Sequence, residues 1–551
     1  MRAMGLFLFL AACGQTAAPP VAEPAADAGA GGSGTVDAAD GAAAADGAAA
    51  ADGAAGADGA DGGALPALAT QTGEANFAIA ANGWYRGDLH FHTNYSEDAK
   101  KQGGDDLKEA LIIADAWRDP VYLAAHPGDA GNGLDFVAVT DHRTDAALHD
   151  PNFKHDHLIV IAGEEFGGTG HAGIWGLKKH IPQDPLGKET QNQRIQDAID
   201  EAHADGALFS PNHPTQDNAW VWDAKHYDGI EIWNGPWSAF YGPVTEADVD
   251  SRAKGIGAEG PFIRQAAVRG GGGGSNSQAM MFWQYHLSDG RHIAPVGGGD
   301  RHMLLPAGLP ATYVHQARKP EFAGKSGQII GPAGILGGIA ARETFVSRSP
   351  FGAQVDLAAE GTDGVLRPMG AELAAGQSYT LHIKVSRAAG GRLRLYSAPL
   401  GKAADGKWPE ATIVWDVPVT APLVAGTWQW QIPAGGAWLH AVVLEPLVVE
   451  PIPQTLDKVL AILSKLPDGK ALGAMVQVFA EMVDVSNLTD AGACDPKSWQ
   501  PWQGQCMPAD KDTWTTYYIP DGIVRLMSTW FEAGVPTQFC CGAVSSAFLG
   551  R

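Results

Sequence analysis

Short apolar runs alternate with helix-like stretches along most of the chain between residues 83 and 347. This alternation favours βα units, in which each helix returns the chain to the next parallel strand of a sheet or barrel. A loop insertion is expected at about 238–277, which ends in a run of glycines. Helices are expected at 106–117, 190–204 and 278–287, and strands at 84–92, 134–140, 158–165, 172–177, 207–210, 229–233, 293–296 and 344–347.

Two or three folded domains are expected, because the chain has 551 residues and a single core rarely grows beyond about 250–300 residues. The alternating region places the first domain at 76–350. Residues 351–448 indicate a small antiparallel β-sandwich, since strand-like runs there are separated by Gly, Pro and Asp turns. Residues 449–551 open with helical signals and end in a cysteine-containing segment. Strands of the sandwich are expected at 379–385, 391–396, 412–415, 427–432 and 437–444.

The first 13 residues are typical of a targeting segment. Arg2 provides a short positive region, an apolar run follows it, and Leu10, Ala11 and Ala12 precede Cys13. This order resembles a bacterial lipobox, in which the cysteine is lipidated and becomes the new N-terminus. We therefore expect an exported lipoprotein held on the membrane through Cys13, on the periplasmic or cell-surface side and by preference on the outer membrane. An ordinary cleaved signal is the alternative.

Residues 14–75 are expected to be a disordered tether, since their low-complexity Ala, Asp and Gly composition up to residue 64 offers no apolar face to bury. The net charge of the chain is −24, and eight of the acidic residues lie in 16–64, where there is no Lys or Arg. The remaining body is mildly acidic. Nucleic acid is therefore not expected as a partner, because binding its backbone requires a basic face.

Four cysteines besides Cys13 lie near the C-terminus, at Cys494, Cys506, Cys540 and Cys541. An even number of cysteines in an exported chain predicts two disulfides. Adjacent cysteines rarely pair with each other, so Cys540 and Cys541 would each reach back to one of the other two. A zinc site is the alternative, although the spacing contains no CxxC pair.

The first expected strand ends in Asp88-Leu89-His90-Phe91-His92. Alternate side chains of a strand share one face, so Asp88, His90 and His92 point the same way. A His-x-His pair of this kind is a good chelate for zinc, manganese or iron.

Similar polar clusters follow the next strands. Each is weak alone, but their succession at strand ends predicts that they converge on one face of a βα barrel, where active sites form. At least seven nitrogen and oxygen ligands would meet there, which is too many for one ion, so two or three ions are expected. The clusters are Asp141-His142, Glu164-Glu165, His171, Asn212-His213 and Asp300-Arg301-His302.

The order HxH, TDH, GxE, H, NHP and GDxH resembles the PHP (polymerase and histidinol phosphatase) superfamily. The resemblance covers about residues 83–350, half of the chain. It implies a distorted seven-stranded βα (TIM-like) barrel carrying up to three metal ions. The segments GDLHFHTNYS, GHAGIWG and GIEIWN resemble the exported branch of the family, which includes carbamate- and ester-cleaving hydrolases.

The resemblance implies a ligand set and roles for neighbouring residues. Glu165 is preferred over Glu164 because the family pattern is Gly-x-Glu. The family also has a ligand about five residues after the HxH pair, usually Asp; here that position is Glu97, with Asp98 beside it, and either one fits. Asp88 and Asp141 are expected to orient imidazoles. The implied metal ligands are His90, His92, Glu97, His142, Glu165, His171, His213, Asp300 and His302.

Two arginines lie beside these motifs. Arg301 stands where related motifs have a small residue, so it either holds an anionic group of the substrate or faces solvent. Arg143 has the same two interpretations, with solvent exposure favoured. Trp233 and Asn234 are expected to line the wall of the pocket, although core packing alone explains Trp233 equally well.

These observations predict a metal-dependent hydrolase that acts on a small, anionic ester. Glu165 and Asp300 would bridge two or three divalent ions (Zn, Mn or Fe), and these ions would activate a water molecule. The predicted activity is that of a phosphoesterase, with Glu165, Asp300 and Arg301 in the catalytic set. Hydrolysis of a carbamate, ester or amide at the same metal site is one alternative. A non-catalytic surface binding lipoprotein is the other.

Overall fold

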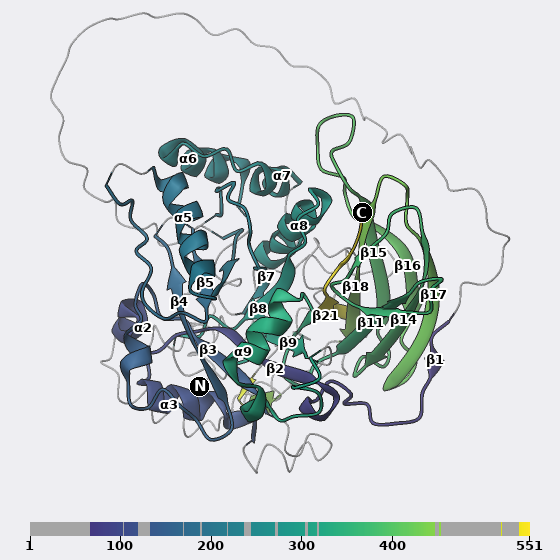
Figure 1. The fold of residues 1–551 in the computed structure, drawn as a ribbon, viewed down its shortest axis with the longest axis horizontal. Helices are drawn as coiled ribbons and strands as arrows, with labels where there is room; N and C mark the ends of the chain where they lie inside the picture. Colours follow the sequence, from purple (N-terminus) through teal and green to yellow (C-terminus); the bar gives the residue numbers. More distant parts are fainter. Residues whose placement is uncertain are drawn as a thin grey trace, which may run out of the picture. The chain divides into compact units, whose positions relative to one another are not determined.

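The protein has a mixed α/β fold, seen in a computed structural model (Figure 1). Seven α-helices lie in the part of the chain that the structure describes. They are α2 (Glu97–Gln102), α3 (Leu107–Ala114), α5 (Gln191–Ala204), α6 (Glu246–Ile256), α7 (Pro261–Arg269), α8 (Gly274–Ser288) and α9 (Gly327–Ala340). The described residues are 67–102, 104–118, 133–168, 170–187, 190–216, 219–235, 244–269, 274–302, 307–316, 319–446, 451–452, 519–520 and 539–551.

The strands of the first half form near the predicted positions. β2, β3 and β4 pair in parallel, and so do β7 and β8. The prediction of a mainly parallel sheet is wrong for the rest, because β5 pairs antiparallel with both β4 and β6, and β9 pairs antiparallel with β2 and β10. The strands are β2 (Trp84–Phe91), β3 (Phe136–Val139), β4 (Ile159–Phe166), β5 (Ala172–Trp175), β6 (Leu208–Pro211), β7 (Gly229–Asn234), β8 (Ala294–Gly298), β9 (Ala311–His315) and β10 (Thr344–Ser347).

Side-chain caps fix where the predicted helices begin. Asp106 accepts a hydrogen bond from the backbone N–H of Glu109 at the start of α3, and Thr190 accepts one from Gln193 at the start of α5. Such caps satisfy backbone donors that have no partner inside the helix. The helices pack through apolar faces, which in α3 comprise Leu107, Ala110, Leu111 and Ala114.

The prediction of a loop insertion at 238–277 is wrong where the structure describes these residues. They form α6, α7 and the beginning of α8. A capping box between Thr245 and Asp248 starts α6. In α7, Phe262 and Ile263 point into the hydrophobic core. Ala266 and Ala267 follow one helical turn later on the same face, a spacing that the high glycine content of the surrounding sequence obscured.

The second half is built from antiparallel strands that were largely predicted. One sheet has the order β1-β17-β14-β11-β12, and β15 pairs with β16 and β18. Inward side chains of both groups share one core, in which Leu381 and Ile383 pack with Leu393 and Val443. The strands are β11 (Gln354–Glu360), β12 (Leu366–Pro368), β13 (Glu372–Leu373), β14 (Ser378–Ser386), β15 (Arg392–Pro399), β16 (Thr412–Pro418), β17 (Leu423–Gln431) and β18 (Ala437–Pro446).

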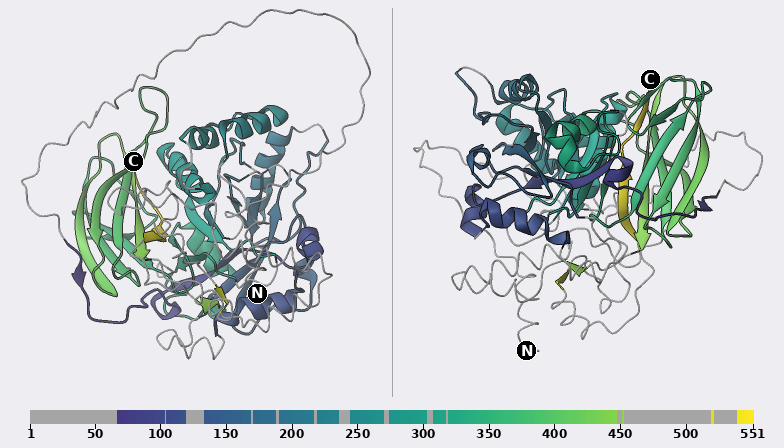
Figure 2. Two further views of the ribbon diagram at one scale, coloured as in Figure 1. Left: turned by 180° about the vertical axis from the view of Figure 1, so that it is seen from behind. Right: turned by 60° about the horizontal axis from the view of Figure 1, so that its bottom comes forward.

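Both ends of the described chain join these sheets. β1 (Ala69–Thr70) pairs antiparallel with β17, so the predicted tether to residue 75 extends too far. At the other end, β21 (Phe539–Ser545) pairs antiparallel with both β10 and β18, and β22 (Phe548–Gly550) pairs with β13 and β18. Figure 2 shows β21 in yellow beside the green strands. The C-terminal strands were not predicted.

Several predictions concern residues outside the described ranges. They include the signal segment, the tether up to residue 66, the helical signals after residue 453, and Cys494 and Cys506. Of residues 449–538 the structure describes β19 (Pro451–Ile452) and β20 (Ile519–Pro520), which form a short parallel pair. None of the described helices has both the length and the apolar character needed to span a bilayer.

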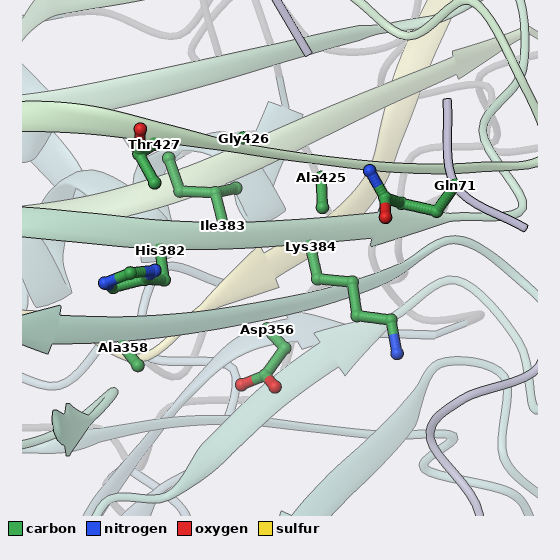
Figure 3. Close-up of a pocket in the computed structure, with 9 residues that line it drawn as sticks. All are labelled: Gln71, Asp356, Ala358, His382, Ile383, Lys384, Ala425, Gly426 and Thr427. Atoms are coloured by element: carbon green, nitrogen blue, oxygen red, sulfur yellow. The ribbon is translucent and has the colours of Figure 1, made fainter. Parts of the chain in front are cut away.

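A pocket of about 380 Å³ lies over β11, β14 and β17 (Figure 3). Asp356, His382 and Lys384 line it, together with small side chains such as Ala358 and Ala425. None of the predicted metal ligands contributes to it. The predicted metal ligands therefore lie elsewhere in the protein.

Candidate metal centre

The end of β2 supplies two buried imidazoles. His90 and His92 lie on the same side of the strand, and their Nε2 atoms are 3.1 Å apart. Asp88 on the same strand accepts hydrogen bonds from the backbone N–H groups of His90 (2.9 Å), Gly299 (3.0 Å) and Gly308 (2.7 Å). Asp88 therefore fixes the backbone around the end of β2, and the prediction that it orients an imidazole is wrong.

Glu165 and Asp300 place two carboxylates against these rings. Glu165 lies near the C-terminal end of β4, and Asp300 follows β8 with φ of 48°. The Nε2 atom of His90 is 3.2 Å from Oε1 of Glu165 and 3.2 Å from Oδ1 of Asp300. The Nε2 atom of His92 is 3.2 Å from the same Asp300 oxygen and 3.4 Å from Oε2 of Glu165. Four ligand atoms thus converge to form one group that could hold a metal ion.

Three further histidines surround Glu165. His142 Nδ1 lies 3.0 Å from Oε2, while His171 Nδ1 and His213 Nε2 lie 3.1 Å and 3.0 Å from Oε1. His142, Glu165 and His171 form a second group whose ligand atoms lie within 4.8 Å of one another. Glu165 belongs to both groups, so one carboxylate is shared by the two sets of possible ligands.

Asp98, rather than Glu97, faces the centre. Its Oδ2 atom is 3.1 Å from Nε2 of His142 and 3.1 Å from Nε2 of His302. The side chain of Glu97 is 83 % exposed and pairs with Lys101. α2 begins at Glu97, and consecutive helical residues point about 100° apart, so only one of the two can turn inward. The assignment of Glu97 as a ligand is therefore corrected to Asp98.

One oxygen of Glu165, Oε2, fits a cation better than direct hydrogen bonding, whereas the other, Oε1, forms hydrogen bonds with His171 and His213. Oε2 of Glu165 is buried and makes no hydrogen bond of acceptable geometry, although His142 Nδ1 is only 3.0 Å away. Ligands about 2.0–2.2 Å from a tetrahedral cation lie about 3.3–3.6 Å from one another. The observed separations of 3.0–3.4 Å between nitrogen and carboxylate oxygen are close to that range. Several lone pairs therefore converge on common points between the side chains.

A hydrogen-bond relay sets the tautomer of His92. Ser96 Oγ donates to Oδ1 of Asp141 (2.9 Å), which has no proton to give when it is ionised. Oγ of Ser96 also lies 2.8 Å from Nδ1 of His92, so that nitrogen must be the donor in this pair. In the neutral ring the lone pair of His92 is then on Nε2, which faces Glu165 and Asp300. Asp141 thus acts on the imidazole through Ser96, a residue that the sequence analysis did not select.

Glu231 has the same effect on His90. Its Oε1 atom lies 3.1 Å from Nδ1 of His90, and its Oε2 atom accepts the backbone N–H of His213 at 2.7 Å. Glu231 lies on β7 and is almost fully buried. Glu231 was not predicted, although an acidic residue inside the apolar run GIEIW indicates a buried polar contact. Carboxylates in this position fix the orientation of a ligating imidazole.

The electrostatics of the centre show how its negative charge is balanced without a cation. Burial lowers the pKa of His92, but its close contacts with the charged Asp300 and Glu165 outweigh burial and raise the pKa to about 10. Burial raises the pKa of Asp300, but the charge of His90 and the close contact with His92 bring it below its usual range. Protons on the imidazoles therefore balance the carboxylates. A cation would displace them, since a ligating imidazole must be neutral.

The remaining predicted residues lie near the ligands in different roles. Asn234 donates from Nδ2 to Oδ2 of Asp300 at 3.1 Å, and Trp233 packs partly buried against the core. Arg143 is exposed and donates from Nε to the carbonyl of Gly167 at 2.7 Å. Its predicted exposure is confirmed.

Arg301 is fully buried, so the solvent-facing interpretation is wrong. Its guanidinium forms an ion pair with Asp105 and lies 5.0 Å from the centre of the Phe91 ring. The backbone N–H of His92 also donates to the carbonyl of Arg301 at 2.9 Å. These contacts give Arg301 a packing role, and they do not support the predicted contact with substrate.

No family model, curated protein or solved structure matches this chain. The chain is a mixed α/β protein with buried clusters of His, Glu and Asp that could hold metal ions.

Proposed function

We propose that this protein is a metal-dependent hydrolase with a phosphoesterase activity. The observation that carries the proposal is the position of Glu165, whose two oxygens lie within 3.4 Å of five imidazole nitrogens, those of His90, His92, His142, His171 and His213. A carboxylate surrounded in this way is suited to bridge two cations. Asp300 and Asp98 supply further anionic ligands at the edges of the same centre.

Bound divalent cations would supply two things, a lowered pKa for a water molecule and polarisation of a substrate oxygen. The residues of this chain do the positioning. Glu231 and Ser96 hold the His90 and His92 rings with their Nε2 lone pairs inward. Asn212 donates from Nδ2 to Oε1 of Glu165 at 3.1 Å and limits the rotation of that carboxylate. No serine or cysteine nucleophile is required.

Charge favours an anionic substrate. Four carboxylates contact the histidines of the centre, those of Asp98, Glu165, Glu231 and Asp300. Two divalent cations would balance this negative charge and three would exceed it, and the surplus of a third cation would attract a phosphoryl group. The ion pair between Arg301 and Asp105 removes the other cation expected to contact the substrate. That observation keeps a carbamate, ester or amide substrate as the second candidate, because such a neutral group needs no guanidinium.

We also propose that the first half is a distorted seven-stranded barrel of the PHP superfamily. β2 to β6 are paired in chain order, β9 and β10 continue the same sheet beyond β2, and β7 pairs with β8. Isolated contacts link the two groups: Phe91, the last residue of β2, pairs with Arg301 beyond the end of β8, and Asp228 donates its backbone N–H to the carbonyl of Phe209 of β6 at 2.9 Å. The second half would then be a β-sandwich, supported by its shared core.

Export as a lipoprotein remains a proposal that rests on Cys13 and the residues before it. It predicts that the full chain, expressed in a bacterium that processes lipoproteins, fractionates with membranes. Replacement of Cys13 by alanine should move the protein to the soluble fraction. An unchanged distribution of the C13A variant would contradict lipid anchoring.

A substrate panel tests the proposed activity. Metal-stripped full-length protein is reloaded with Mn²⁺ or Zn²⁺ and assayed with p-nitrophenyl phosphate, bis-p-nitrophenyl phosphate and a naphthyl carbamate. Hydrolysis of a phosphate ester that disappears in Glu165→Gln supports the proposal. Hydrolysis of the carbamate alone supports the second candidate. Background rates on all three with fully loaded protein would contradict both and favour a binding function.

A further inference from the structure

A second group of ligating side chains lies away from the candidate metal centre. It consists of Asp115, which follows the last residue of α3, and of His155 and His157, which precede β4. One ligand atom of each residue lies within 4.8 Å of the others. Glu165 is near the opposite end of β4, and eight residues of extended chain span about 26 Å. The two groups therefore share no ligand and lie at opposite ends of one strand.

The carboxylate of Asp115 is fixed by its surroundings. Its side chain is 15 % exposed, and its Oδ1 atom accepts a hydrogen bond from Nε of Arg118 at 2.9 Å. The Oδ2 atom lies 2.8 Å from Nδ1 of His157. Because Arg118 occupies only the first oxygen, the second is directed at the histidines.

The two imidazoles come from a His-Asp-His sequence. The chain bends at these residues, just before β4, and the ring centres of His155 and His157 are 5.7 Å apart. The Nδ1 atom of His155 accepts only long hydrogen bonds, from the backbone N–H groups of His157 (3.2 Å) and Leu158 (3.4 Å). A cation can compete for that lone pair.

We propose that Asp115, His155 and His157 form a second, separate binding site for a divalent transition cation of the Zn²⁺ type. Two imidazoles and one carboxylate suit zinc and its neighbours, whereas Ca²⁺ and Mg²⁺ prefer sets made only of oxygen. The side chain of His157 is 58 % exposed, so water completes the coordination. A cation here would tie the end of α3 to the beginning of β4.

Counting bound zinc tests this proposal. The full-length chain is stripped with a chelator, titrated with Zn²⁺, freed of excess metal and analysed for zinc per chain. The double variant H155A/H157A should bind about one equivalent less than the unaltered protein. His149→Ala is the matched control, because His149 is an exposed histidine at a nearby position that approaches Asp145 only to 3.8 Å. The control should lose no zinc.

The experiment separates this second site from the proposed hydrolase activity. If the buried centre binds no metal, the unaltered chain still binds about one equivalent and H155A/H157A binds none. If both sites bind, the double variant keeps its metal-dependent activity and Glu165→Gln loses it. Asp115→Asn, which keeps the shape of the side chain, should also lower zinc binding and serves if the double variant fails to fold. Equal zinc content in all folded variants would overturn the proposal.

Discussion

The Oε1 atom of Glu231 lies 3.1 Å from Nδ1 of His90, whose other nitrogen is 3.2 Å from Glu165. A buried carboxylate thus holds the imidazole that faces the bridging carboxylate of the proposed centre. This arrangement allows Glu231 to control metal binding without contacting a cation.

Glu231→Gln should weaken metal binding by about 10–100-fold, because loss of such a supporting carboxylate leaves the ligand misoriented and less basic. Competition with a chromophoric chelator measures the affinity. Glu360→Gln is a suitable control, since Glu360 also pairs with a histidine, His382 at 2.7 Å, on the second half of the chain. Equal affinities for both variants would show that Glu231 has no such role.

Replacement of adjacent acidic residues should separate Asp98 from Glu97. Asp98→Asn removes a carboxylate that lies 3.1 Å from both His142 and His302, so about one equivalent of metal should be lost. Glu97→Gln should leave the metal content unchanged, because its side chain is 83 % exposed. Elemental analysis of both variants decides the matter. The reverse order of effects would contradict the placement of α2.

Metal binding should release protons. In the metal-free protein the pKa of His92 is raised to about 10, so its ring is protonated at pH 7 and must become neutral to bind a cation. The apparent affinity should therefore increase about tenfold per pH unit for each proton released, at pH values below about 10, where the metal-free ring is protonated. Calorimetric titration in buffers with different ionisation enthalpies measures the number of protons. A release of zero would show that the imidazoles are already neutral.

The same shift predicts how the metal-free fold responds to pH. A folded-state pKa of about 10 for His92 lies above its unfolded value, so the protonated ring stabilises the fold at low pH. This contribution is fully present below about pH 6.5 and is lost as the pH rises towards 10. Chemical denaturation with chelator present should therefore show decreasing stability over that range. An increase would contradict the assigned interactions.

The last strands should contribute strongly to stability. Phe548 in β22 is fully buried in the core of the second half, so Phe548→Ala should lower the free energy of unfolding by about 3–5 kcal/mol. Val365→Ala is the control, because Val365 is 50 % exposed and its truncation should change stability by less than about 0.5 kcal/mol. Denaturant titrations compare the two. Similar small effects would mean that the C-terminal strands are dispensable.

The sequence predicted the strand-borne ligands because the strand repeat fixes which side chains share a face. His90 and His92 are the clearest case, and Glu165, His213 and Asp300 lie with them in the structure. The choice between Asp98 and Glu97 as the ligand was left open, because it depends on how the first turn of α2 is rotated. Glu231 and Ser96 were missed because their contacts join residues that are 141 and 4 positions from their histidines, without a repeated pattern.

The fold was predictable where local patterns determine it. Most strands of both halves were placed within a few residues, but the antiparallel pairing of β5 depends on a tight reversal after β4 that involves Gly167 and Gly170, both at positive φ. β21 was missed because a strand between β10 and β18 is specified by its partners rather than by its own sequence. Long-range pairing of this kind leaves little local signal.

Diffraction from a crystal of the metal-loaded protein, recorded at the absorption edge of the metal, tests the central claim most directly. The account predicts at least two anomalous peaks about 3.5–4 Å apart, one on each side of Glu165, with His90 and His92 bound to one ion and His142 and His171 near the other. Absence of any peak next to Glu165 in fully loaded protein would contradict it.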